Sequence, residues 1–259
     1  MLIGVIHSNK EMLEVYLNLS KTYDTYLIDE FSKESDLIVP DIIVFPINGI
    51  DEEGNIKGNH GKIILNKAFY KQLKDKKIFA GIHVPFLQAL QYPIHYYLED
   101  QQVIMQNAVF TAEGVLFLLI DCTQLSILEL KIDLIGYGVC GKVIYDLLKA
   151  MGAHVRVIRR EVDISNEDMI SIQRWKQMEC GDVIINTAPA VIIDRERMSS
   201  FIKKPVIIDI ASGNQIDEKD ALYYGIRLIQ GKSLPAIFAS KSAGKLIGEY
   251  IRGIIDAKE

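Results

Sequence analysis

The stretch Asp133–Gly141, which reads DLIGYGVCG, decides the fold. An apolar run leads into three glycines at the spacing G-x-G-x-x-G, and apolar residues then recur at helical intervals over 142–150. A second apolar run follows at His154–Arg159. This order of strand, tight turn, helix and strand is the context in which the glycine motif predicts a dinucleotide-binding turn.

Each glycine of this stretch has a separate expected task. Gly136 permits the tight turn, Gly138 lets the backbone approach a pyrophosphate, and Gly141 lets the helix pack closely on the strand. The N-terminus of the helix offers free N–H groups to the phosphates. The alternative is a glycine-rich turn that binds no ligand, and Cys140 is interpreted as a small residue that fits the turn. The predicted cofactor contacts of the turn are Gly136, Tyr137, Gly138, Val139, Cys140 and Gly141.

The end of the second strand indicates which nucleotide binds. In NAD-binding turns an acidic residue stands there, about 20 residues after the glycines, and holds the ribose 2′-hydroxyl. Here Arg159 and Arg160 occupy this place, and a guanidinium suits a 2′-phosphate. The sequence therefore predicts NADP(H), although Glu161 follows directly and leaves NAD possible.

Two later apolar strands, at 182–187 and 205–210, end in small and polar residues. Because ligands of open parallel sheets bind at the carboxyl ends of the strands, we expect these residues to line the cofactor. The alternative is that both are loops without a ligand. The predicted contacts are Asn186, Thr187, Ala188, Pro189 and Ser212.

Composition and charge exclude several classes of protein. A net charge of −5 over 259 residues argues against a nucleic-acid-binding face. The N-terminus lacks the features of a signal peptide, and no uninterrupted apolar run is long enough for a membrane span. The three cysteines are far apart, as in free thiols of a reducing compartment. These observations predict a cytoplasmic protein that does not contact a membrane.

Alternating strands and helices predict an α/β fold with two Rossmann-like parallel-sheet domains and a cleft between them. The expected domains are an N-terminal flavodoxin-like or Rossmann-like substrate domain over 1–114, an NADP(H)-binding domain over 115–238, and a C-terminal helix over 239–259 that returns to the first domain. The expected strands lie at 2–7, 26–29, 41–46, 77–82, 102–105, 132–137, 155–158, 182–187, 205–210 and 227–229; the longer helices are expected at 10–19, 166–178, 217–224 and 240–256.

Several motifs occur together in the order of one known family. They are Thr111–Gly114 (TAEG), the glycine turn, Asn186–Ala190 (NTAPA), Ile208–Ser212 (IDIAS) and Lys241–Gly244 (KSAG). In this order the chain resembles the family of the dipicolinate synthase A subunit. The resemblance implies a two-domain protein related to the D-isomer specific 2-hydroxyacid dehydrogenases. It also implies oxidation of a dihydrodipicolinate-type dicarboxylate with NADP, a role in sporulation, and a separate flavoprotein-like second subunit.

The chain departs from the family pattern on the substrate side. Ser212 is followed by Gly213, Asn214 and Gln215, where the family has Pro-Gly-Gly, and other glycines of that region are replaced. Two alternatives therefore stay open. One is a non-catalytic dinucleotide-binding subunit or sensor, and the other is a two-domain dehydrogenase of the hydroxyacid or shikimate type.

Hydride transfer usually also needs a group that handles a proton. His83 follows an apolar strand, and Lys241 opens the last helix, where a cation suits a dicarboxylate. Thr111 and Glu113 are expected to open a helix between the domains, where Thr111 also fits an N-cap. A structural or solvated role is the alternative for each. No His/Cys cluster suggests a metal, and a homo-oligomer is expected by analogy with two-domain dehydrogenases.

Overall fold

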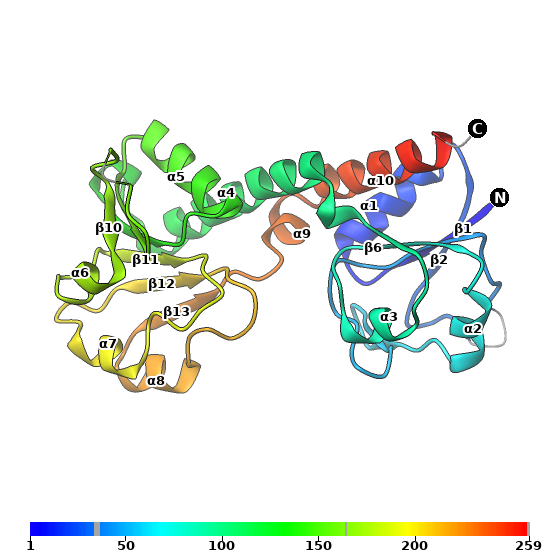
Figure 1. The fold of residues 1–259 in the computed structure, drawn as a ribbon, viewed down its shortest axis with the longest axis horizontal. Helices are drawn as coiled ribbons and strands as arrows, with labels where there is room; N and C mark the ends of the chain where they lie inside the picture. The colour runs from blue at the N-terminus through cyan, green and yellow to red at the C-terminus, as the bar shows by residue number, and fades with distance from the viewer. Residues whose placement is uncertain (34–36, 164, 258–259) are drawn as a thin grey trace. The chain divides into compact units, whose positions relative to one another are not determined.

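A computed structural model describes residues 1–33, 37–163 and 165–257. The chain folds into two compact units (Figure 1). Unit 1 comprises 1–107 and 235–259, and unit 2 comprises 108–234. Both boundaries fall inside helices, so the domain boundaries expected at 114 and 238 stay predictions.

Unit 1 is built on a five-stranded sheet in which every neighbouring pair is parallel. Its three central strands are short and buried, because their apolar runs are covered on both faces. The order is β2-β1-β3-β6-β7, and a small antiparallel hairpin, β4-β5, stands apart from it. The strands are β1 Leu2–Ile6, β2 Asp24–Ile28, β3 Ile42–Val44, β4 Ile56–Lys57, β5 Lys62–Ile63, β6 Lys77–Ala80 and β7 Ile94–Tyr96.

The last helix of the chain, α10 Ser240–Asp256, packs against α1 Lys10–Leu19 within unit 1 (Figure 1). The predicted bounds of α10 are confirmed. Its contact surface is made by two glycines one turn apart. A Cβ atom on Gly244 would lie 2.5 Å from the backbone oxygen of Glu11, and one on Gly248 would lie 2.6 Å from Asn18 Oδ1. The remaining helices of unit 1 are α2 Lys67–Gln72, α3 Pro85–Ala89 and the 3₁₀ turn η2 Tyr97–Glu99.

Unit 2 holds a six-stranded parallel sheet in the order β10-β9-β8-β11-β12-β13. This is the strand order of dinucleotide-binding domains, and it reverses between β8 and β11. The predicted α/β class with two parallel-sheet domains is therefore confirmed. The strands are β8 Lys131–Ile135, β9 His154–Arg159, β10 Met169–Ser171, β11 Val183–Asn186, β12 Val206–Asp209 and β13 Arg227–Gln230.

A buried carboxylate on a central strand connects this sheet to the segments packed beside it. Asp133 on β8 forms an ion pair with Arg156 at 2.7 Å and accepts a hydrogen bond from Trp175 Nε1 at 2.6 Å. It also accepts one from the backbone of Gly181 at 2.9 Å. These partners compensate the burial of the charge, so Asp133 has a structural role. The helices of unit 2 are α5 Val139–Ala150, α6 Ile172–Lys176, α7 Arg195–Ser200, α8 Glu218–Tyr223 and the turn η3 Ile127–Glu129; α9 Leu234–Phe238 leads back to unit 1.

Two of the predicted elements are of the wrong type. The segment expected as a strand at 102–105 belongs to α4, Gln101–Thr123, whose length lets its buried side chains enter the core of unit 2. The helix expected over 166–178 is replaced by strand β10 and the short helix α6, because Met169 and Ile170 pair with β9.

Helix α4 also bears on the membrane prediction. By length and composition alone it could cross a membrane, with a mean hydropathy of 1.8, and 39% of that window is buried. Core helices pass the same test, and Val115 and Leu119 of α4 are fully buried in the core of unit 2. One such helix is weak evidence for a span, so the absence of membrane contact stays a prediction.

Candidate functional site

The turn between β8 and α5 lies at the carboxyl edge of the sheet, next to the point where the strand order reverses. Gly136 has φ +96°, and a Cβ atom there would lie 2.4 Å from Thr187 Oγ1. A Cβ atom on Gly141 would lie 2.6 Å from the backbone oxygen of Gly136. The close approach of helix, turn and β11 therefore requires glycine at both positions.

Gly138 serves a different purpose in the same turn. It is the N-cap residue of α5, no side chain caps this helix, and a Cβ atom on Gly138 would have no neighbour within 4 Å. The first N–H groups of α5 are therefore accessible, with the partial positive charge of the helix N-terminus behind them. This is the geometry in which a phosphate group binds to a helix.

The two arginines predicted to contact a 2′-phosphate lie at the same edge of the sheet. Arg159 is the last residue of β9, which pairs with β8, and Arg160 follows it. The guanidinium of Arg159 is 6.0 Å from the centre of the Tyr137 ring, so it stands over the glycine turn. Arg159 is half-buried, whereas Arg160 and Glu161 are exposed.

Strands β11 and β12 end beside the turn in a network of polar groups. Thr187 Oγ1 donates to the backbone oxygen of Ile135 at 3.0 Å, which ties β11 to the start of the turn. Asn186 Nδ2 donates to Asp209 Oδ1 at 2.9 Å, and both side chains are buried. The other predicted cofactor contacts follow the ends of these strands. Ala188 is half-buried, while Pro189 and Ser212 are exposed.

Two further residues of this network were not predicted as site residues. Lys232 Nζ lies 3.6 Å from Asp209 Oδ2 and donates to the backbone oxygen of Gly213 at 2.9 Å and to that of Ala211. Asp209 Oδ2 is buried and accepts no hydrogen bond. An acidic residue at the end of an apolar strand was the available signal for Asp209, but nothing local marks Lys232.

The expectation that Thr111 and Glu113 open a helix was wrong. Both lie within α4, which begins at Gln101, so Thr111 is not an N-cap. Thr111 is buried, while Glu113 is exposed, because residues two apart lie on different sides of a helix. Burial raises the pKa of the Cys140 thiol, and a side-chain hydrogen bond with Thr111 offsets part of that shift. The structure thus places Thr111 behind the glycine turn and Glu113 away from it.

His83 and Lys241 both belong to unit 1. His83 follows β6, its Nε2 lies 2.7 Å from Glu99 Oε1, and its ring centre lies 3.7 Å from that of Tyr96. Glu99 thus fixes one ring nitrogen, and Gln88 Nε2 lies 3.5 Å from the other. Lys241 is exposed in the first turn of α10. In the described ranges, no group of three or more His, Cys, Asp or Glu side chains could hold a metal ion.

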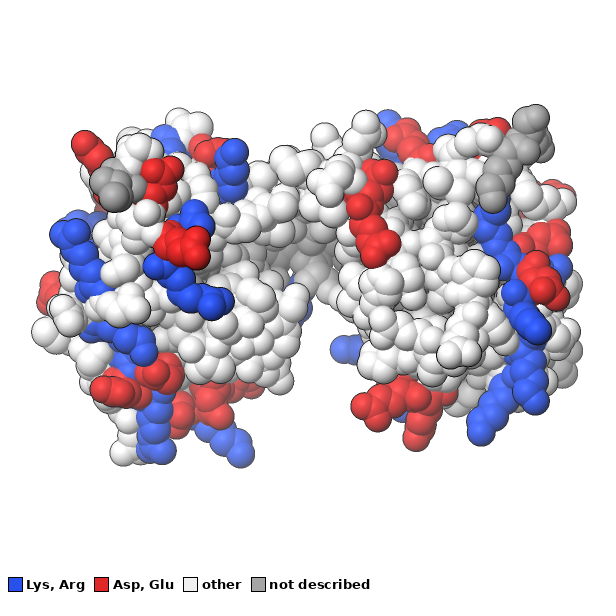
Figure 2. Space-filling view, in the orientation of Figure 1, with Lys and Arg blue, Asp and Glu red and all other residues white. Residues whose placement is uncertain are grey.

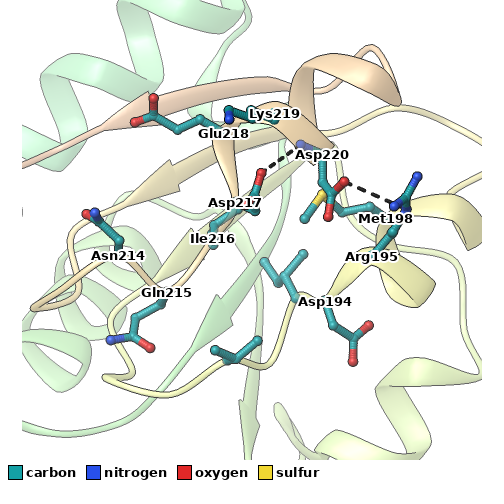
Figure 3. Close-up of a pocket in the computed structure, with 12 residues that line it drawn as sticks. Asp194, Arg195, Met198, Asn214, Gln215, Ile216, Asp217, Glu218, Lys219 and Asp220 are labelled. Carbon is teal, nitrogen blue, oxygen red and sulfur yellow. Dashed lines mark hydrogen bonds and ion pairs between the residues drawn. The ribbon is translucent and has the colours of Figure 1, made fainter.

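A pocket of about 530 Å³ opens elsewhere in unit 2, between the starts of α7 and α8 (Figure 3). Asp194 and Asp217 cap these helices, and Arg195 lies 3.7 Å from Asp220. The lining residues include none of the glycine turn. Four acidic side chains against two basic ones make the pocket unsuited to phosphates; its charged residues are Asp194, Arg195, Asp217, Glu218, Lys219 and Asp220.

Taken together, the strand order, the glycine turn and the two-unit architecture define the fold of a dinucleotide-binding, two-domain dehydrogenase. The predicted resemblance to the A subunit of dipicolinate synthase is confirmed by comparison with known proteins. The A subunit of dipicolinate synthase from Bacillus subtilis (strain 168) is 24% identical over 230 residues, which cover 83% of this chain and 77% of the relative. No protein-family model matches the chain.

Solved structures show the same likeness. The crystal structure of the A subunit of dipicolinate synthase from Bacillus halodurans has a TM-score of 0.85 and 23% identity, covering 98% of this chain and 97% of that one. D-lactate dehydrogenase with NAD+ from Lactobacillus jensenii has a TM-score of 0.58 and 16% identity, covering 97% of this chain and 95% of that one. At these identities the structures establish the fold.

Proposed function

We propose that the chain is an NADP(H)-dependent oxidoreductase, similar to the A subunit of dipicolinate synthase, that oxidises a dihydrodipicolinate-type dicarboxylate by hydride transfer to NADP. The open N-terminus of α5, next to Arg159, is the observation that carries this proposal. The N–H groups of α5 would hold the pyrophosphate, and the guanidinium would hold the 2′-phosphate. When bound, NADP supplies the hydride acceptor.

The charge at the end of β9 favours NADP over NAD. Two guanidinium groups, those of Arg159 and Arg160, stand where an NAD-binding domain has an acid. Glu161 is the nearest acid and stands after them. The lactate dehydrogenase neighbour was solved with NAD+, so the proposed preference for NADP rests on the arginines and not on the fold.

The polar network at the ends of β11 and β12 supports a place for the nicotinamide. Asp209 Oδ2 accepts no hydrogen bond, and Asn186 donates to the other oxygen of the same carboxylate. Lys232 supplies the compensating positive charge at 3.6 Å. We assign these three residues to hydrogen bonding with the carboxamide and to fixing the ring that receives the hydride.

Conversion of a dihydropyridine into a pyridine releases a proton as well as a hydride. His83 is the best-supported acceptor, because its contact with Glu99 at 2.7 Å holds one ring nitrogen and orients the ring. Lys241 is better suited to binding a carboxylate than to accepting the proton. Thr111 contacts Cys140 behind the cofactor turn, and Glu113 is exposed, so neither is favoured as the acceptor.

The cofactor assignment is tested by separate titrations of NADPH and NADH into the full-length protein. Replacing Arg159 and Arg160 with alanine should weaken NADPH binding by about 10- to 100-fold, since one or two charge-assisted hydrogen bonds are lost. NADH binding should change little. Arg195→Ala is the matched control, because Arg195 is an exposed arginine of the same unit outside the turn. Tighter NADH binding by the unchanged protein would contradict the arginine argument.

Activity separates the proposed enzyme from the sensor alternative. The protein should convert a dihydropyridine dicarboxylate while NADPH absorbance rises at a rate proportional to protein concentration. NADPH binding without turnover, even in the presence of a flavoprotein-like second subunit, would identify a non-catalytic dinucleotide-binding protein. Turnover with a 2-hydroxyacid alone would favour the hydroxyacid dehydrogenase alternative.

The proposal extends to partners and place of action. The relative is named as one subunit of a synthase, which supports a second subunit here, and a cytoplasmic location suits a reaction that consumes NADP. Exposed apolar residues on α4, including Met105, Val109 and Ile120, support a homo-oligomer, which light scattering can test. On the face of unit 2 in Figure 2, basic and acidic side chains are interspersed, which does not favour nucleic acid.

A further inference from the structure

The N-termini of α1 and α10 lie side by side in unit 1. Helix α1 follows β1 after three residues, so its N-terminus is at the carboxyl edge of the sheet. Gly244 packs against Glu11 and Gly248 against Asn18, while Tyr23 after α1 donates to Asp256 at the end of α10. Residues later in α10 contact residues later in α1, so the two helices run parallel. Both N-termini therefore point to the edge at which ligands of parallel sheets bind.

These two N-termini differ in how their N–H groups are satisfied. Asn9 caps α1 by accepting a hydrogen bond from the backbone of Met12 at 3.0 Å. Helix α10 begins after Ala239 and has no side-chain cap. Lys241 in its first turn is exposed and forms no ion pair with any described residue. A cation at a helix N-terminus is unfavourable on its own, so this arrangement suits a bound anion.

Two buried polar atoms next to these N-termini have no hydrogen-bond partner. They are Ser8 Oγ and Glu11 Oε1, in residues that are 9% and 1% exposed. Side chains on a helix tilt toward its N-terminus, so the Glu11 carboxyl is directed to the same end of α1. Leaving such groups unpaired costs free energy, which a ligand would recover by accepting from them.

The protonation of Glu11 decides whether it can donate. Burial raises its pKa to about 7, so the neutral carboxylic acid is present near neutral pH and carries an O–H donor. Burial is the cause of this shift, the Tyr97 hydroxyl of η2 lies close enough to interact with the carboxyl, and α10 places Gly244 against the Glu11 backbone oxygen. Lys241 lies one turn before Gly244.

We infer that Ser8, Glu11, Lys241 and the free N–H groups of α10 form a carboxylate subsite in unit 1, which holds one carboxylate of a small dicarboxylate. Every member of the subsite is a hydrogen-bond donor when Glu11 is protonated, and an oxyanion is the ligand that such a set selects. The dicarboxylate class rests on the proposed function. The subsite itself rests on the geometry of unit 1.

The experiment is calorimetric titration of dipicolinate into the full-length protein without cofactor. Lys241→Met should weaken binding about tenfold, the effect of one charge-assisted contact. Lys245→Met is the matched control, because Lys245 is an exposed lysine one turn further along α10 that pairs with Glu249 at 3.7 Å. Its affinity should equal that of the unchanged protein. Ser8→Ala should weaken binding by a smaller factor.

The pH dependence gives a second, independent readout. Dipicolinate affinity of the unchanged protein should fall between pH 6 and pH 8, as Glu11 loses its proton and becomes an acceptor. Glu11→Gln keeps a donor at every pH, so its affinity should stay constant over that range. Circular dichroism confirms that each variant is folded.

Several outcomes would overturn this inference. They are the absence of saturable dipicolinate binding, equal affinities for Lys241→Met and Lys245→Met, or tighter binding of inorganic phosphate than of dipicolinate at the same site. NADPH titration of the same samples tests the proposed function separately, because its predicted contacts lie in unit 2. Suppose that the Lys241→Met and Ser8→Ala variants bind dipicolinate as tightly as the unchanged protein, while NADPH binding and turnover are intact. That result would reject the subsite and leave the proposed function standing.

Discussion

The first strand of each sheet, β1 or β8, is followed by a turn and a helix, but the N-termini of these two helices are filled in opposite ways. In unit 1, Asn9 fills the N-terminus of α1 with its own side-chain oxygen. In unit 2, Gly138 occupies the equivalent place before α5 and leaves it open. Parallel topology places both turns at a ligand-binding edge, but one side chain decides whether a phosphate can reach the helix.

The buried polar groups at the two edges differ as well. In unit 2, Asn186 and Asp209 are hydrogen-bonded to each other, and Lys232 supplies a counter-charge. In unit 1, Ser8 Oγ and Glu11 Oε1 have no hydrogen-bond partner. A network that is mostly satisfied fixes an orientation in advance, whereas unpaired groups favour the state in which a ligand satisfies them. The contrast assigns nucleotide positioning to unit 2 and anion recognition to unit 1.

The largest expected effect is that of adding a side chain at the closely packed glycine of the turn. Gly136→Ala should lower the free energy of unfolding of unit 2 by about 2–5 kcal/mol, from strain at positive φ and overlap with Thr187. Trp175, the single tryptophan of the chain, is buried in unit 2, so urea unfolding followed by its fluorescence measures the change.

Gly138→Ala is the control for that substitution. Its Cβ atom meets nothing in the protein, so the stability of unit 2 should be nearly unchanged, while NADPH affinity should fall. Equal stability of the Gly136→Ala protein and the unchanged protein would mean that the turn is not closely packed on β11.

The second-largest expected effect is a pH dependence of the free energy of unfolding, which comes from Glu11 in unit 1. The pKa of Glu11 is about 7 in the folded protein and about 4.5 in the unfolded chain, so the folded state binds the extra proton between these values. Stability from this residue is therefore fully present below pH 4.5 and is lost as pH rises to about 7, by roughly 3 kcal/mol in total. Glu11→Gln removes this dependence.

The difference in stability between the Glu11→Gln variant and the unchanged protein reports on Glu11 alone, because all other carboxyl groups are common to both. Thermal unfolding by circular dichroism should show the glutamine variant gaining stability over the unchanged protein as pH rises from 5 to 8. A constant difference across that range would show that Glu11 is already ionised in the folded state.

Much of this fold could be predicted from local sequence patterns. The G-x-G-x-x-G turn follows an apolar strand and opens an amphipathic helix, and the geometry at Gly136, Gly138 and Gly141 matches the expected separate tasks. Whether these residues bind a nucleotide stays a prediction. Residues 240–256 carry helical periodicity that is strong enough to place both ends of α10.

The failures come from residues whose state is decided by distant contacts. Val103, Ile104 and Met105 read locally as a strand, but they belong to a helix of 23 residues whose later turns pack in unit 2. Met169 and Ile170 read as helix, but pairing with β9 makes them a strand. Tertiary contacts override local propensity in both cases.

Distant contacts also explain why some residues of the site were not predicted. Lys232 and Asp209 are 23 residues apart and meet only because β12 and β13 are neighbours. Glu11 reads as an ordinary charged residue in the first turn of a helix, and its burial reflects distant parts of the chain, since Gly244 of α10 lies against its backbone and Tyr97 of η2 interacts with its carboxyl. No periodicity or spacing records such contacts.

The smallest effect tests the contrast between the two helix N-termini directly. Asn9→Ala removes the cap of α1 and should cost about 1 kcal/mol in the free energy of unfolding, measured by circular dichroism in urea. Trp175 fluorescence and NADPH affinity should not change, because both report on unit 2. A loss of NADPH affinity would mean that the cofactor depends on the turn of unit 1. An unchanged stability would mean that water replaces Asn9, and that the two N-termini are more alike than their caps suggest.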